Sequence, residues 1–179
     1  MPFAFTSYRR INDNFISFKG GRQVADENFL SSVECYDPFL NRWIPVAPMH
    51  EPRAYCGLVS VGSYLYAIGG YNDTSWLRSV ERFDPLTNQW TMLTPMSTAR
   101  SAFGATVWNG RIYVTGGNGT SHALNTAEKF NPRTNTWHCA QSISNGRVGL
   151  ATVTVKIPLK MEWSFHLGLI ESRHYQKAI

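Results

Sequence analysis

The stretch "SVERFDPLTNQW", residues 79–90, occurs three times in this chain with few changes. The chain reads "SVECYDPFLNRW" 47 residues earlier and "TAEKFNPRTNTW" 47 residues later. All three copies keep a glutamate, a turn with proline and asparagine, and a tryptophan in the same register. A period of this size, kept over three copies, is the signature of a repeat architecture.

Each copy predicts four short strands, as the second copy shows. Residues 55–61 ("YCGLVSV") and 64–70 ("YLYAIGG") are apolar and β-branched, and Gly62-Ser63 separates them as a turn. A polar loop leads to residues 79–84, and a further turn leads to residues 89–93. Short strands with such connections indicate an antiparallel meander, and no apolar spacing in the repeats is helical. The sequence therefore predicts an all-β fold.

The residues that recur in each copy are interpreted as scaffold. Glycine doublets permit positive φ and close approach of a neighbouring chain, and proline with asparagine suits a turn. The tryptophans are expected to fill the space between adjacent sheets, and a radial stack of such sheets is a β-propeller. The predicted structural motif residues are Gly20, Gly21, Glu34, Trp43, Gly69, Gly70, Glu81, Trp90, Gly116, Gly117, Glu128 and Trp137.

The glycine doublets, the spaced glutamates, the "DPxTNxW" pattern and the Pro-Met…Arg linkers ending at Arg53 and Arg100 resemble the kelch repeat. More narrowly, they resemble the propellers of the kelch-like (BTB-BACK-kelch) family over residues 11–155. The Gly-His and Trp-Asp signatures of WD40 propellers, which have a similar period, are absent. We therefore expect a kelch-type β-propeller fragment of about three four-stranded antiparallel blades with an irregular C-terminal tail.

The strand order A-B-C-D that the resemblance implies divides the chain into segments. We expect a lead at 1–10, a partial blade B-C-D at 11–46, blades at 53–93 and 100–140, a single A strand at 147–155, and a non-kelch tail at 156–179. Repeat arrays need capped ends, so we expect a truncated or alternatively ended product. In a second interpretation, two arcs close a ring as a dimer, the last A strand of each completing the first blade of the other.

Charge and composition argue against several classes of protein. The net charge is +5, but the excess lies in residues 1–22 and 156–179, and residues 23–155 sum to zero. Nucleic-acid binders usually carry basic charge on the folded body, so no nucleic-acid partner is expected. No apolar run approaches a membrane span, and no membrane partner is expected. With three cysteines, no C-x-x-C pair and no secretory signal, we expect a cytoplasmic protein.

No catalytic constellation is visible, and we predict no enzyme, no metal and no cofactor. The five histidines show no regular spacing with carboxylates or cysteines, and the chain lacks HExxH, G-x-S-x-G and a phosphate-binding glycine loop. A copper oxidase of the galactose-oxidase type remains a remote alternative. That chemistry needs tyrosine, cysteine and two histidines at the ring axis, whereas Cys35 and Cys139 have outer-strand positions and Cys56 a packing position.

Recognition is expected on one rim, where the B–C loops and D–A linkers of a propeller emerge. The recurring linker arginines can be interpreted as part of the scaffold. The resemblance instead implies that they contact acidic peptide motifs, and an arginine at this position suits bidentate binding of a carboxylate. The resemblance also implies a substrate-contacting tyrosine after the doublet, as at Tyr71; Trp76 is either an exposed anchor or a cap on the sheet. The predicted partner-contacting residues are Arg22, Arg53, Tyr55, Tyr71, Arg100, Ser101, Asn118 and Arg147.

The predicted function is protein binding. The resemblance implies a substrate-recognition subunit of a cullin-RING E3 ubiquitin ligase, which binds a short acidic motif of a ubiquitination substrate. In that family, BTB and BACK domains hold the cullin, and we expect neither in the few residues before the first repeat. The alternatives are actin or cytoskeleton binding, as in other kelch proteins, and a non-functional truncated isoform.

Overall fold

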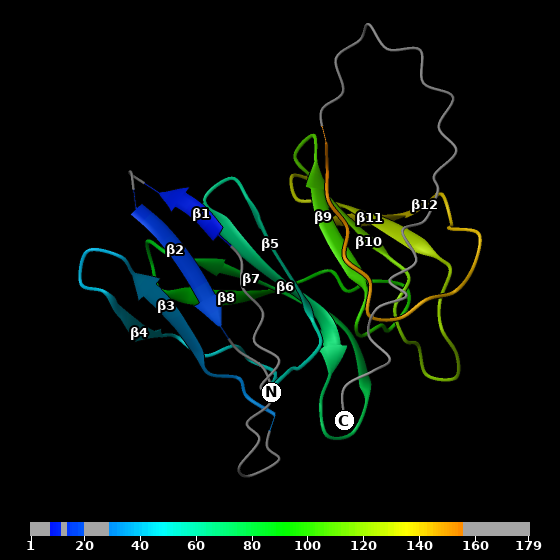
Figure 1. The fold of residues 1–179 in the computed structure, drawn as a ribbon, viewed down its shortest axis with the longest axis horizontal. Helices are drawn as coiled ribbons and strands as arrows, with labels where there is room; N and C mark the ends of the chain where they lie inside the picture. Colours follow the sequence, from blue (N-terminus) through cyan, green and yellow to red (C-terminus); the bar gives the residue numbers. More distant parts are fainter. Residues whose placement is uncertain (1–7, 12–13, 20–28, 156–179) are drawn as a thin grey trace, which may run out of the picture.

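The computed structural model describes residues 8–11, 14–19 and 29–155. These residues form three four-stranded antiparallel sheets and no helix, as Figure 1 shows. The sheet of β5–β8 lies between the other two, so the chain builds a row of sheets in sequence order (Figure 1). The predicted all-β fold of three four-stranded sheets is confirmed.

The strand bounds follow the 47-residue period. The first sheet contains β1 (Tyr8–Ile11), β2 (Asn14–Lys19), β3 (Val33–Asp37) and β4 (Arg42–Val46). The second contains β5 (Gly57–Val61), β6 (Tyr64–Tyr71), β7 (Trp76–Asp84) and β8 (Gln89–Leu93). The third contains β9 (Gly104–Trp108), β10 (Arg111–Thr115), β11 (Ala127–Asn131) and β12 (Thr136–Ala140). Neighbours in sequence are neighbours in each sheet, which is the predicted meander.

The first sheet has one strand more than we expected. Residues 1–10 were predicted to be a lead before three strands, but Tyr8–Ile11 pairs with β2 from Tyr8↔Ser17 to Ile11↔Asn14. This strand takes the A position and satisfies backbone groups on the edge of β2. The signal was weak because the connection has Asn12-Asp13, without the glycine of the other A–B turns.

The predicted A strand at residues 147–155 is wrong, because no strand is formed there. The segment instead lies beside β9 (Figure 1), where Thr154 Oγ1 donates to the Val107 carbonyl at 2.9 Å and lies 2.9 Å from Thr106 Oγ1. The side-chain hydrogen bonds of Thr154 are thus with the preceding sheet.

Both faces of the middle sheet are buried. Along β6, Leu65 and Ala67 face the first sheet while Tyr66 and Ile68 face the third, as the two-residue period of a strand requires. The core between the first and second sheets consists of Val33, Met49, Leu65, Ala67, Phe83 and Trp90. The core between the second and third consists of Val59, Tyr66, Ile68, Val80, Met96, Phe103, Ile112, Val114 and Phe130.

The turn residues adopt the backbone conformations that the sequence indicated. Asn41, Asn88 and Asn135 have φ of 48°, 53° and 54°, in the left-handed region that asparagine tolerates. Gly70 has φ of 103°, and a Cβ there would lie 2.6 Å from the Ala54 carbonyl oxygen. The second glycine of the doublet is thus needed for backbone geometry and for the close approach of the linker.

Candidate functional site

The B–C loops and the linkers between sheets lie at the same end of the strands, because neighbouring strands are antiparallel. The loops span residues 72–75 and 116–126, and the linkers span residues 47–56 and 94–103. We call this end of the molecule the rim. The A–B and C–D turns lie at the opposite end, so residues on the rim from different sheets can act together on one partner.

Backbone hydrogen bonds connect each linker to the loop that follows the glycine doublet. Ala54 and Tyr71 exchange two N–H···O bonds of 2.9 Å each, and Ser101 and Asn118 exchange bonds of 3.0 and 2.7 Å. The Ala102 N–H donates to the Tyr55 carbonyl at 2.8 Å, which joins one linker to the next. The structure therefore brings these predicted rim residues of two sheets together on a rigid backbone frame.

Tyr55 is the one rim tyrosine with an unfavourable backbone. Its φ is 53°, and the equivalent positions Ala102 and Gly149 have φ of 49° and 70°. A non-glycine residue in this region costs about 1–2 kcal/mol, and such costs cluster at functional sites. The Tyr55 side chain is half-buried. A bulky side chain thus stands where the other copies have a methyl group or none.

Tyr71 belongs to a small aromatic cluster on the same rim. Its ring lies 5.0 Å from the ring of Trp76 and 5.6 Å from that of Phe29, both edge-to-face. All three side chains are half-buried. Trp76 is therefore packed on Tyr71, and the cluster holds the Tyr71 ring in place at the mouth of the loop.

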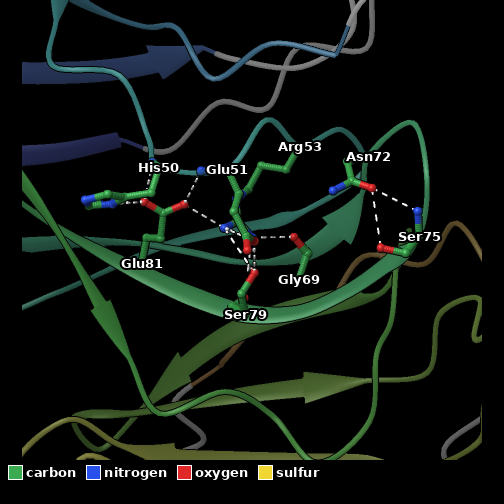
Figure 2. A network of polar contacts seen from close by, with 8 residues as sticks. All are labelled: His50, Glu51, Arg53, Gly69, Asn72, Ser75, Ser79 and Glu81. Atoms are coloured by element: carbon green, nitrogen blue, oxygen red, sulfur yellow. Dashed lines mark hydrogen bonds and ion pairs between the residues drawn. The ribbon is translucent and has the colours of Figure 1, made fainter.

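Arg53 and Arg100 do not reach the surface, so their assignment as partner-contacting residues is wrong. Both are 0% exposed. Arg53 Nη2 donates to Glu81 Oε1 at 2.7 Å and Nη1 to the Gly69 carbonyl at 2.7 Å, as Figure 2 shows. These two acceptors, one carbonyl and one carboxylate, hold the guanidinium inside the interface between the sheets. The structural interpretation of these arginines is the correct one.

The second arginine repeats the contacts that the first makes with its own blade. Arg100 Nη2 donates to Glu128 Oε1 at 2.8 Å, and Nη1 donates to the carbonyls of Gly116 at 2.9 Å and Thr126 at 3.1 Å. Burial raises the pKa of Glu128, but hydrogen bonds from Ser97 and Arg100 outweigh burial, so its pKa lies below the ordinary value. The carboxylate is held in its charged form.

Glu81 receives equivalent bonds from its own linker. Burial raises the pKa of Glu81, but the backbone N–H of His50 and the guanidinium of Arg53 outweigh burial, and the pKa lies below the ordinary value. The His50 N–H donates to Oε2 at 2.7 Å, and the Glu51 N–H donates to Oε1 at 3.2 Å (Figure 2). Ser79 Oγ bonds to Glu51 beside this pair. Sequence reasoning missed these linker contacts, although His50 and Ser97 also lie 47 residues apart.

The other predicted contact residues are distributed unevenly. Ser101 is only 5% exposed, so its side chain offers little to a partner, whereas Asn118 and Arg147 are half-buried. The Arg147 N–H donates to the Leu124 carbonyl at 3.2 Å, which matches Arg100 with Leu77 at 3.1 Å. Arg22, Gly20 and Gly21 lie outside the described residues.

The described residues contain no group of three or more His, Cys, Asp or Glu side chains placed to hold a metal ion. Their cysteines, Cys35, Cys56 and Cys139, are free thiols. Burial raises the pKa of Cys35 and of Cys56 to about 11. Within the same part of the chain, no helix has the length and apolar character needed to cross a membrane.

Comparison with known proteins agrees with this architecture. Relatives include Kelch-like protein 42 of Mus musculus, 39% identical over 59 residues, or 33% of this chain and 12% of the relative. Kelch-like protein 8 of Caenorhabditis elegans is 41% identical over 70 residues, or 39% and 10%. Kelch-like protein 23 of Homo sapiens is 48% identical over 40 residues, or 22% and 7%. The matched segments therefore span 7–12% of the length of these relatives.

A solved structure titled "Structure of YjhT" aligns with a TM-score of 0.67 over 83% of this chain and 54% of that one. At 19% identity, this likeness shows the fold. A family model described as "Kelch motif" matches residues 20–50, 52–97 and 99–144. The first match covers β3 and β4, and each of the other two covers a whole sheet. The chain therefore belongs to the kelch-repeat family, and its three sheets are blades of a kelch-type β-propeller.

Proposed function

We propose that this kelch-repeat chain is a protein-interaction module that binds its partner with the rim. The observation that carries the proposal is the position of Tyr55, a half-buried tyrosine with φ of 53° on a linker bonded to its neighbour. Tyr55 keeps a bulky side chain in a backbone conformation that disfavours one, at a position where the other blades have alanine and glycine. Tyr71 and Asn118 lie on the same frame.

The chemistry of the rim favours recognition by aromatic contacts and hydrogen bonds. Arg53 and Arg100 are neutralised inside the blade interfaces, which withdraws two of the cations on which an acidic peptide ligand would depend. Among the described residues that we assign to the rim contacts, Arg147 is the remaining cation. We therefore propose a partner segment that places apolar or hydrogen-bonding side chains on Tyr55 and Tyr71, with an acidic residue near Arg147.

We further propose that the partner is a substrate of a cullin-RING ubiquitin ligase. The similarity to the kelch-like proteins supports this role, because the resemblance of the repeats implies recognition of ubiquitination substrates. Contact with the cullin would come through BTB and BACK domains and not through the blades. The cytoplasm suits three free thiols, since its reducing conditions keep cysteines unpaired.

The test compares proteins captured from cytosolic extract by the 179-residue chain and by a Tyr55→Ala/Tyr71→Ala variant, using quantitative mass spectrometry. We expect specific partners to be lost from the variant and to be kept by Phe39→Ala, which removes a 77% exposed aromatic ring at the opposite end of the strands. Equal capture by both variants would refute the rim as the binding site. The ligase role further requires that captured proteins accumulate when cullin-RING ligases are inhibited.

A further inference from the structure

Three residues at equivalent positions of the repeat follow one another along the rim. Tyr55, Ala102 and Gly149 lie 47 residues apart and have φ of 53°, 49° and 70°. The Ala102 N–H donates to the Tyr55 carbonyl at 2.8 Å, and the Gly149 N–H donates to the Ala102 carbonyl at 2.8 Å. The three residues are therefore direct neighbours in space and have similar backbone conformations.

The size of the side chain falls along this series. Tyr55 carries a phenol ring, Ala102 a methyl group and Gly149 only hydrogen. Apart from its two chain neighbours, a Cβ at Gly149 would have no heavy atom of the described residues within 4 Å. The bulk that Tyr55 supplies at its own position thus has no counterpart at the next two. We call Ala102 and Gly149, with their small side chains, the step.

The position after the glycine doublet changes in the same direction. Tyr71 in the second blade corresponds to Asn118 in the third. Each is held to its linker by a pair of backbone N–H···O bonds, both of 2.9 Å in the second blade and of 3.0 and 2.7 Å in the third. The second blade thus presents two phenol rings where the third presents a methyl group and an amide. The half-buried amide of Asn118 can donate and accept hydrogen bonds beside the step.

Arg147 brings a cation to the end of the step, since it lies two residues before Gly149. Its N–H donates to the Leu124 carbonyl at 3.2 Å, and its carbonyl accepts the Gly117 N–H at 2.9 Å, so its backbone is fixed. Its Nε lies 3.5 Å from the Asn145 carbonyl oxygen, which is long for a hydrogen bond. The other two linker arginines are each paired with a buried glutamate, whereas no carboxylate of the described residues pairs with Arg147. A carboxylate of a partner can therefore pair with it.

We propose that the step seats one bulky apolar side chain of the partner, and that an adjacent acidic residue of the partner pairs with Arg147. The inference rests on the proposed function, because it takes the rim as the binding surface and adds which partner residue the rim selects. Tyr55 forms one border of the seat, and the Asn118 amide can bond to the backbone of the partner segment.

Burial and charge both favour this kind of residue. A large aromatic or aliphatic side chain on the step covers the Ala102 methyl group and borders the Tyr55 ring, which removes apolar surface from water on both sides. The backbone bonds along the series are already formed, so little ordering entropy opposes binding. A basic residue next to the bulky one would be repelled by Arg147. The step therefore selects a bulky apolar residue with an acidic neighbour.

Selection of random peptides displayed on phage against the immobilised 179-residue chain tests the composition of the partner segment. We expect the selected peptides to share one aromatic or large aliphatic residue next to an aspartate or glutamate. The same selection on Arg147→Glu should replace the preference for acidic residues by one for lysine and arginine, because the charge at the step is reversed. Arg42→Glu reverses an exposed arginine at the opposite end of the strands and is the matched control, which should leave the preference unchanged.

A fluorescently labelled peptide from the wild-type selection then measures affinity by fluorescence polarisation. Ala102→Tyr fills the step and should raise the dissociation constant at least about tenfold. Ala102→Gly, which copies Gly149, is the matched control and should keep the affinity within about threefold. Tyr55 already carries a phenol ring in the backbone conformation of Ala102, so we expect the Ala102→Tyr variant to fold. Circular dichroism and the urea midpoint check this.

Substitution in the peptide makes the same comparison without any change to the fold. Alanine in place of the shared bulky residue should weaken binding to the wild-type chain about tenfold. The same peptide should lose much less affinity for Ala102→Tyr, because the seat is already blocked there. A full additional loss in that variant would mean that the bulky residue binds elsewhere, and would overturn the inference.

The Tyr55→Ala/Tyr71→Ala variant separates this inference from the proposed function. If this variant loses the peptide while Ala102→Tyr binds it as the wild type does, the rim binds the partner but the step is not the seat. If both variants bind the peptide as the wild type does, the rim and the seat are both wrong. Selected peptides without a shared bulky residue, a preference for acidic residues that survives Arg147→Glu, or a failure to enrich any peptide would also overturn the inference.

Discussion

Arg53 and Glu81 form an ion pair of 2.7 Å in which neither side chain is exposed, and the pair joins a linker to the blade that follows it. The pair recurs 47 residues later as Arg100 and Glu128 at 2.8 Å. Breaking a buried pair by removing one partner leaves an uncompensated charge in a place that water cannot reach. The two pairs are therefore expected to be decisive for folding.

Substitution Arg53→Met is expected to lower the free energy of unfolding by about 3–5 kcal/mol, because Glu81 is left buried without its cation. Urea unfolding followed by tryptophan fluorescence measures the change. Glu51→Gln is the matched control, since this glutamate is 36% exposed and lies 3.4 Å from the same guanidinium. The control should cost under about 1 kcal/mol. Equal costs for both would contradict a special role of the buried pair.

The same pairs make stability depend on acidic pH. The pKa values of Glu81 and Glu128 lie below the ordinary 4.5, because hydrogen bonds to the carboxylates outweigh burial. Their stabilisation is complete above the unfolded pKa and is lost as the pH falls through the folded pKa. The urea midpoint should therefore fall progressively as the pH drops below about 4.5. Glu81→Gln should weaken this dependence, and an unchanged slope would count against the assignment.

Asn88 combines two roles that a pair of substitutions separates. Its φ is 53°, and its Oδ1 accepts the Ala47 N–H at 2.9 Å. Asn88→Gly keeps the backbone conformation and removes the bond, at a cost of about 0.5–1.5 kcal/mol. Asn88→Ala adds the left-handed penalty of about 1–2 kcal/mol. Urea unfolding should rank wild type above glycine and glycine above alanine, and the reverse order of the two variants would exclude the backbone role.

The three free thiols should differ in reactivity. Cys139 is exposed, whereas Cys56 is buried and burial raises its pKa to about 11, as it also does for Cys35. The thiolate is the reactive form, so a thiol reagent at neutral pH should modify Cys139 first and the other two only on unfolding. Ellman's reagent followed by mass spectrometry gives the order. Cys139→Ser should remove the fast phase, and rapid modification of Cys56 in the folded chain would contradict the burial.

Much of the fold was predictable because the same turn and strand residues recur in all three copies of the repeat. Asn41, Asn88 and Asn135 were expected in turns and adopt positive φ, and Gly70 was expected where a chain approaches closely. These features depend on neighbours in sequence. Local rules also placed eleven of the twelve strands of the described residues in their blades, since alternating apolar residues and turns mark them.

The recurrence of Arg53 and Arg100 could not reveal on which side of the backbone their side chains lie. Recurrence fits a scaffold role and a binding role alike, and only the position of Glu81, 28 residues further on, decides between them. The segment 147–155 shows the same limit. Its residues suit a strand, but in the fold Thr154 bonds to Thr106 and Val107 of the preceding sheet, which no local pattern indicates.

The sequence alone determined the repeat, the all-β class, the three blades and the residues that permit their turns, because these follow from side-chain periodicity and backbone preference. The tertiary structure alone decided which recurring side chains are buried, that β1 completes the first blade, and which backbone hydrogen bonds join Tyr55, Tyr71 and Asn118 to the linkers. Burial and proximity depend on contacts between residues far apart in the chain, and a local sequence pattern does not determine these contacts.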